Sequence, residues 1–227
     1  MKNLTLLACT LLLTISVLES AEIGFSGDVT VVSTYVFRGL KQFSGAALQG
    51  TGEFSYGPVT AGMWVSSFNG SVPVETDPYL SVALPTGEIE TSIGVQLFSY
   101  DLFSRREYSV YELTATAGYG PFSGAFFFTP KQDYQESGET VELVPDALYW
   151  VELGAGTAFM GADLSATLGY GTFSSFLSAG ETDKATTTLL LSAGKSLSEK
   201  LSASWNWSIA LDEYTDNVFF LQAGYRF

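Results

Sequence analysis

The chain ends in Asn217-Val-Phe-Phe-Leu-Gln-Ala-Gly-Tyr-Arg-Phe227, and this stretch decides the fold. Successive side chains of a β-strand point to opposite faces, so alternate residues share a face. One face would carry Phe219, Leu221, Ala223, Tyr225 and Phe227. The other face would carry Val218, Phe220, Gln222, Gly224 and Arg226. The stretch therefore predicts a strand with one apolar face and one mixed face, and with an aromatic last residue.

A terminal strand of this kind resembles the closing strand of outer-membrane β-barrels in Gram-negative bacteria. In that class the terminal motif is also bound by the barrel-assembly machinery, and the resemblance implies that Phe227 is the assembly signal here. The alternative is a C-terminal edge strand of a soluble β protein. The rest of the sequence has to decide between these two interpretations.

The composition favours a membrane protein built from strands. The chain has 227 residues, of which 46% are hydrophobic, 15% aromatic and 15% charged. A soluble surface usually carries about 25–35% charged residues. Beyond the N-terminus there is no apolar run of about 18 residues, which excludes a protein that spans a membrane with helices.

The charge and the missing histidines exclude several functions. The net charge is −14, so the chain repels nucleic acid, and we expect no nucleic-acid partner. There is no His, which removes the commonest general base and the commonest metal ligand. A hydrolase with paired carboxylates is conceivable, but the sequence shows no pairing signal. We therefore predict no enzymatic activity, no catalytic residue, no metal and no cofactor.

The N-terminus resembles a secretory signal peptide. Lys2 precedes an apolar run over residues 4–18 that is too short to span a membrane. Cleavage is expected near Ser20 or Ala21, so residues 1–21 form the signal peptide and residues 22–227 the barrel domain. Cys9 lies in a weak lipoprotein-like box, which we discount because the apolar run continues after it.

Turn residues divide the remaining chain into twelve expected strands. Their expected ranges are 27–40, 46–56, 59–68, 76–84, 88–100, 107–119, 122–130, 146–159, 162–173, 184–195, 200–211 and 217–227. Most are long enough for a tilted membrane strand of about 9–11 residues. Their connections alternate between short and long, and the longest, residues 131–145, is polar and acidic. This predicts an all-β fold: an antiparallel transmembrane barrel of about twelve strands, with short periplasmic turns and longer extracellular loops.

The polar faces of these strands indicate which side meets lipid. In the range 200–211 the polar face carries Ser202, Ser204, Asn206 and Ser208, small groups that suit a narrow lumen. The opposite face carries Trp205, Trp207 and other apolar residues. Aromatic residues also gather beside the short turns, as in an interfacial girdle: Tyr56, Tyr119, Phe122, Tyr225 and Phe227.

The first strands resemble a known family. Val31-Val-Ser-Thr-Tyr-Val-Phe-Arg-Gly-Leu40, Ala47-Leu-Gln-Gly50 and Tyr56-Gly-Pro-Val-Thr-Ala-Gly-Met-Trp-Val-Ser66 are similar to the signature of the TorF-type porin family (Gcw_chp). The match is good over residues 27–69 and looser afterwards, and Thr34 and Val36 replace an Asp and an Arg that are frequent in the family. The resemblance implies a channel in the outer membrane, with no established substrate and no assigned functional residues.

The candidate site is the lumen. Alternation places seven charges inward, as tentative pore-lining residues: Arg38, Glu53, Glu90, Glu112, Glu152, Asp163 and Arg226. The acidic excess predicts a channel for small solutes with a mild preference for cations. The alternative is a plugged structural or interaction barrel, filled by salt bridges, whose extracellular loops bind a partner. The other expected partners are the lipid of the Gram-negative outer membrane and the barrel-assembly machinery.

Overall fold

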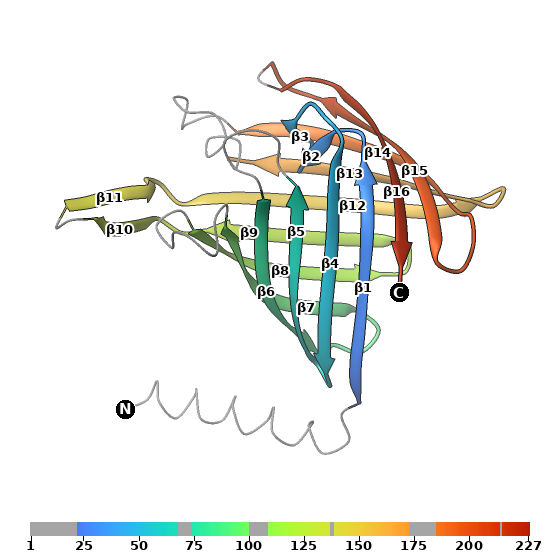
Figure 1. Cartoon of the computed structure of the whole chain (residues 1–227), viewed down its shortest axis with the longest axis horizontal. Helices are drawn as coiled ribbons and strands as arrows, with labels where there is room; N and C mark the ends of the chain where they lie inside the picture. The colour runs from blue at the N-terminus through green and yellow to red at the C-terminus, as the bar shows by residue number, and fades with distance from the viewer. Residues whose placement is uncertain (1–21, 68–73, 100–108, 137–138, 173–184, 214) are drawn as a thin grey trace.

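A computed structural model describes residues 22–67, 74–99, 109–136, 139–172, 185–213 and 215–227. Twelve strands close into one antiparallel barrel, which confirms the predicted fold class (Figure 1). They are β1 (Ile23–Val32), β4 (Ala47–Tyr56), β5 (Val59–Ser67), β6 (Val74–Leu84), β7 (Glu90–Ser99), β8 (Ser109–Tyr119), β9 (Phe122–Thr129), β12 (Leu148–Phe159), β13 (Ala162–Gly171), β14 (Thr186–Ser196), β15 (Leu201–Ala210) and β16 (Val218–Arg226). Each pairs with its sequence neighbours in the barrel, and β1 pairs with β16 to close it. Within the described residues no helix is long and apolar enough to cross a membrane.

Short turns define one end of the barrel, which we call the short-turn end. Gly57 and Gly120 both have φ 57°, so the two Tyr-Gly-Pro sequences form similar turns. Met160 and Gly161 make a third turn with φ 52° and 77°. We call the opposite end, where the long connections lie, the long-loop end.

The expected first strand, 27–40, is wrong in its second half. β1 ends at Val32, and the chain then forms a small hairpin from β2 (Tyr35–Phe37) and β3 (Leu40–Phe43). Arg38 and Gly39 form its turn with φ 52° and 81°. Two consecutive positive φ angles suit a two-residue hairpin turn, which follows the twist of the strands. We call residues 35–43 the inner hairpin. The other predicted strands agree with the structure to about two residues at each end.

The expected loop 131–145 is also structured. It contains a second hairpin, β10 (Gln132–Glu136) and β11 (Glu139–Val144), which projects from the barrel wall between β9 and β12 (Figure 1). At its base Val144 packs against Val110 and Leu148. Lys131 donates a hydrogen bond to Glu142, and this contact raises the pKa of the lysine above its ordinary value. The loop's polar sequence hid a strand pair whose described polar residues include the exposed Asp133, Thr140 and Glu142.

The side-chain alternation of the barrel matches the expected faces. On β15 the outward Trp205 is 66% exposed, whereas the next residue, Asn206, is 6% exposed. On β16 Phe219, Leu221 and Tyr225 are exposed, while Phe220 between them is buried. The outer surface of the barrel is therefore apolar, and the polar faces enclose the lumen.

Candidate functional site

The inner hairpin lies inside the barrel, at the long-loop end. Its turn contacts strands two and three places from β1 in the barrel order: Thr188 of β14 donates a hydrogen bond to the Arg38 carbonyl at 3.3 Å. Ser208 of β15 donates one to the Gly39 carbonyl at 2.9 Å. Gly39 is required there, because a Cβ at this position would lie 2.6 Å from Thr188 and φ is positive. The same tip also contacts Glu112 of β8, five strands from β15 in the barrel order, so the inner hairpin extends across the lumen.

An ion pair holds the tip of the inner hairpin to β8. The two guanidinium nitrogens of Arg38 donate to the two carboxylate oxygens of Glu112 at 2.8 and 2.5 Å. Both side chains are buried, with 5% and 1% exposure. The guanidinium also lies 4.0 Å from the ring centroid of Phe127, and Thr129 donates a hydrogen bond to Glu112. This bidentate geometry fixes orientation as well as charge.

Aromatic contacts hold the sides of the inner hairpin. Tyr35 packs against Trp64 of β5 with ring centroids 5.6 Å apart, and its hydroxyl donates to Glu75 of β6. Phe37 meets the inward Phe98 of β7 edge-on at 5.7 Å. The long-loop half of the lumen is therefore occupied by packed side chains.

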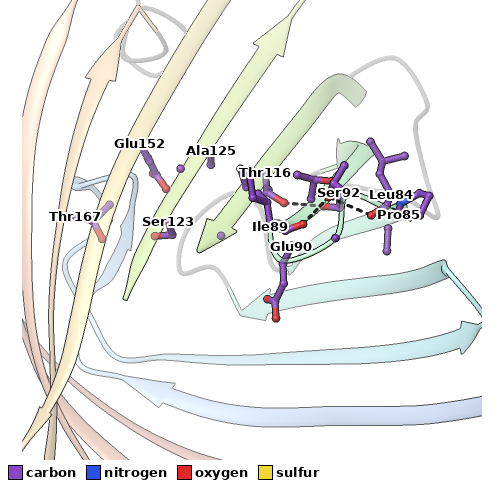
Figure 2. A pocket seen from close by; sticks show the side chains of 17 residues that line it. Leu84, Pro85, Ile89, Glu90, Ser92, Thr116, Ser123, Ala125, Glu152 and Thr167 are labelled. Carbon is purple, nitrogen blue, oxygen red and sulfur yellow. Dashed lines mark hydrogen bonds between the residues drawn. The ribbon is translucent and has the colours of Figure 1, made fainter. Parts of the chain in front are cut away.

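The short-turn half of the lumen holds a large cavity instead. Its volume is about 740 Å³, and Glu90 of β7 and Glu152 of β12 line it from different strands (Figure 2). Most of its other lining is small: Ser92, Thr116, Ser123, Ala125 and Thr167 are examples. A second cavity of about 570 Å³ shares Glu90 and Thr167 with it and lies at the same end. Small inward residues leave this half hollow.

A third cavity of about 380 Å³ lies beside the inner hairpin. The inner hairpin contributes Tyr35, Val36 and Phe37. The barrel wall contributes Gln49, Thr51, Trp64, Asp77, Tyr79 and Gln96. We call it the side cavity, and it combines aromatic rings, amides and one carboxylate.

The seven predicted charges fall into separate environments. Arg38 is on the inner hairpin and not on a wall strand, which corrects its predicted position, and it pairs with Glu112. Glu53 accepts hydrogen bonds from Ser26 at 3.0 Å and Tyr79 at 2.5 Å.

Four of the seven lie elsewhere in the barrel. Glu90 and Glu152 line the large cavity, and Glu152 accepts a hydrogen bond from Trp150 at 2.9 Å. Asp163 and Arg226 are exposed near the short-turn end. That these residues line a conducting pore stays a prediction.

The sequence reasoning missed three inward carboxylates. Glu75 and Asp77 of β6 are 2% and 1% exposed, and Asp28 of β1 lies on the same face as the buried Thr30. Asp77 accepts hydrogen bonds from the Ser99 amide at 3.1 Å and from Gln96 at 3.3 Å. Alternation along the expected strands 27–40 and 76–84 can find Asp28 and Asp77, whereas Glu75 lies one residue before the expected strand.

Comparison with protein-family models finds no match to this chain, and comparison with curated proteins finds none either. Membership of the TorF-type family therefore stays a prediction. Solved structures do match. The COG4313 outer membrane channel from Pseudomonas putida F1 aligns over 92% of this chain and 97% of its own, at 14% identity and a TM-score of 0.54.

Two further structures align with lower scores. Acinetobacter baumannii OccAB3 aligns over 92% of this chain and 65% of its own, at 11% identity and a TM-score of 0.44. OmpF from Salmonella typhi aligns over 91% and 98%, at 9% identity and a TM-score of 0.45. The likeness to the Pseudomonas channel shows that this chain has the fold of an outer-membrane β-barrel.

Proposed function

We propose that the protein is an outer-membrane channel for the passive passage of small solutes, with a modest preference for cations. Residues 1–21 direct its export, and the C-terminal strand with Phe227 is recognised by the assembly machinery. The apolar outer face of the barrel supports a lipid environment, since outward residues such as Trp205 and Phe219 are more than half exposed. The long-loop end then faces outside the cell.

The observation that carries the proposal is the hollow short-turn half of the lumen. A barrel that served only as a structural plug would gain stability from filling this space, because packed interiors leave few voids larger than water. Here the two cavities of about 740 and 570 Å³ instead meet at Glu90 and small polar residues. The inner hairpin then acts as the constriction, and the side cavity lies beside it.

The balance of inward charges supports the cation preference. Arg38 is neutralised by Glu112, and Arg226 lies near the short-turn end. Among the described inward residues the carboxylates outnumber these two cations: Asp28, Glu53, Glu75, Asp77, Glu90, Glu112, Glu152 and Asp163. A narrow lumen with low-dielectric walls concentrates the resulting field and attracts cations.

Planar-bilayer recording of the purified, refolded protein tests this proposal. A salt gradient across the bilayer should give a reversal potential on the cation-selective side, and the preference should shrink at high salt. A reversal potential of the opposite sign would contradict the charge assignment. Fractionation of cells should recover the mature protein in the outer membrane, as a band whose mobility changes on heating.

A plugged interaction barrel is the second candidate, and the inner hairpin favours it. Its tip is fixed by the buried Arg38–Glu112 pair, and the β10–β11 hairpin offers a projecting surface at the long-loop end. Under this alternative the wild-type protein carries no current. Deletion of residues 133–142 would then abolish binding of a partner while the barrel still assembles.

A further inference from the structure

The side cavity is unlike the rest of the lumen. Its volume of about 380 Å³ lies within the range of ligand pockets, about 300–1,000 Å³. Four of its lining residues are aromatic: Tyr35, Phe37, Trp64 and Tyr79. The large cavity of the short-turn half, by contrast, is lined mostly by small residues (Figure 2). Small polar residues would be enough to pass hydrated ions, whereas the rings that pack the inner hairpin against the wall also line a cavity of ligand size.

The sheet register explains how one carboxylate is presented among these rings. Asp28, Thr51, Trp64 and Asp77 are consecutive partners across β1, β4, β5 and β6, and they form one row on the inner wall. Asp77 is 1% exposed and is oriented by the Ser99 amide and by Gln96. Among its described contacts no Lys or Arg pairs with it. Its carboxylate therefore lines the side cavity and has no ion-pair partner among the described residues.

The neighbouring groups make the side cavity more negative. Tyr79, which lines the cavity, donates its hydroxyl to Glu53, and Asp28 lies at the end of the row. The inner hairpin carries two described cations: Arg38, whose guanidinium is held by Glu112, and Lys41, the cross-strand partner of Val36. No Lys or Arg is among the lining residues of the described structure. An anionic solute would be repelled here.

We infer that the side cavity is a binding site for a small organic cation, of the ammonium type, on its way through the channel. Aromatic faces attract ammonium groups within about 6 Å of the ring centroid, most strongly for quaternary ammonium, and a carboxylate adds charge complementarity. Gln49 and Gln96 can bind a hydroxyl or amide group of the same solute. The inference rests on the proposed channel function and names its substrate class.

Two other ligands fit less well. A divalent metal ion prefers several carboxylate or carbonyl oxygens, and the side cavity offers Asp77 as its one carboxylate among the described lining residues. A neutral sugar could stack on Trp64 and bind the amides, but it would not form an ion pair with the Asp77 carboxylate. The test therefore compares a cation with neutral molecules.

The experiment uses choline as the probe and the full-length protein in detergent micelles. Calorimetry and tryptophan fluorescence measure its binding beside its uncharged isostere, in which a tert-butyl group replaces the trimethylammonium group, and beside glucose. We expect choline to bind at least about fivefold more tightly than the isostere, because only choline gains the cation–π and charge attraction. Equal binding of the two, or tighter binding of glucose, overturns the inference.

Two variants locate the site. Asp77→Asn should weaken choline binding at least about tenfold and leave the isostere unchanged. Thr51→Lys introduces an ammonium group in the row that contains Trp64 and Asp77, and it should also weaken choline binding. This second variant keeps the test valid if Asp77→Asn fails to fold. Ser165→Lys, an inward substitution outside the side cavity, should leave choline binding unchanged. Wild-type affinity in both Asp77→Asn and Thr51→Lys overturns the inference.

Bilayer recording separates this inference from the channel proposal. Choline should reduce the potassium current of the wild type and should do so less in Thr51→Lys. A protein that binds choline as described but carries no current would contradict the channel and leave the site standing. A protein that conducts, but binds choline and the isostere alike, would contradict the site and leave the channel standing.

Discussion

The two halves of the lumen are built from the same strands and yet differ in what fills them. At the long-loop end Trp150 and Ser208 are fully buried and Phe220 is nearly so, because the inner hairpin and its neighbours occupy the space. At the short-turn end inward residues such as Glu90 and Ser165 are exposed to a cavity. One barrel wall can therefore enclose a packed core at one depth and a hollow space at another.

The difference follows from the inward side chains as well as from the inner hairpin. Inward aromatic residues lie toward the long-loop end, with Phe98, Phe127, Trp150 and Phe220 as examples. Toward the short-turn end the same strands turn Ser92, Ser123 and Gly154 inward. Large apolar groups favour burial against the inner hairpin, whereas small polar groups can remain hydrated.

The largest effect on the difference between the filled and the hollow half of the lumen should come from breaking the ion pair at the tip of the inner hairpin. Arg38→Ala leaves Glu112 buried without its partner, and we expect a loss of about 3–5 kcal/mol in unfolding free energy. The released inner hairpin should also raise the single-channel conductance. Urea unfolding, followed by the heat-sensitive gel mobility, measures the first effect, and bilayer recording measures the second.

The double variant Arg38→Met with Glu112→Leu is the control for this prediction. It removes both charges and keeps apolar bulk, so it should recover most of the lost stability. Arg38→Ala with wild-type stability and conductance would show that the pair does not hold the inner hairpin in place.

A charge on the outer surface should be costly in a way that does not depend on the lumen. Leu191 lies at the middle of β14 and points outward. Leu191→Arg should cost about 2–4 kcal/mol if it meets the centre of the bilayer. Unfolding in phospholipid vesicles measures this cost. A negligible cost would mean that this face does not contact lipid.

Two inward serines should respond differently to the same substitution. Ser208 is fully buried and hydrogen-bonded to the inner hairpin. Ser208→Arg should therefore displace the inner hairpin and lower the unfolding free energy by about 1–3 kcal/mol through overpacking. Ser165 faces the cavity of the short-turn half, so Ser165→Arg should change the unfolding free energy by less than about 0.5 kcal/mol. Similar costs at both sites would contradict the division into a filled and a hollow half.

The smallest expected effect is on ion selectivity. Glu90→Gln and Glu152→Gln remove charges that line the hollow half, and each should lower the cation preference without a change in stability. Reversal potentials at low salt measure the change. At about 1 M salt the difference from wild type should vanish, because the Debye length is then about 3 Å. A difference that persists at high salt would indicate a change of pore shape instead of charge.

The strands of the barrel follow from local sequence patterns. The alternation of side chains has a period of two in every strand, and this period shows directly in residues such as Trp205, Asn206 and Trp207. Gly and Pro mark the short turns for a local reason, namely their restricted or unusual φ angles. Strand bounds and the apolar outer face could therefore be predicted from neighbours along the chain.

Part of the lumen could also have been predicted but was missed. The inward Phe98 and Phe220 interrupt otherwise small or polar faces, which was a signal that something packs against them. The same alternation places Asp77 inward within the expected strand 76–84, and it places Glu75 inward once β6 is known to begin at Val74. These residues needed correct strand bounds and no knowledge of distant contacts.

What occupies the lumen depends on contacts between residues that are far apart in the sequence. Residues 33–40 continue the alternating pattern of β1, and nothing local shows that the chain leaves the wall after Val32. The positive φ angles of Arg38 and Gly39 give the turn of the inner hairpin, but contacts with Glu112, 74 residues away, and with Ser208, 169 residues from Gly39, hold it inside. Such contacts arise because closing the sheet brings distant strands around one space. The strands of the wall thus follow from the local alternation of side chains, whereas the packing inside the lumen depends on contacts that form when the barrel closes.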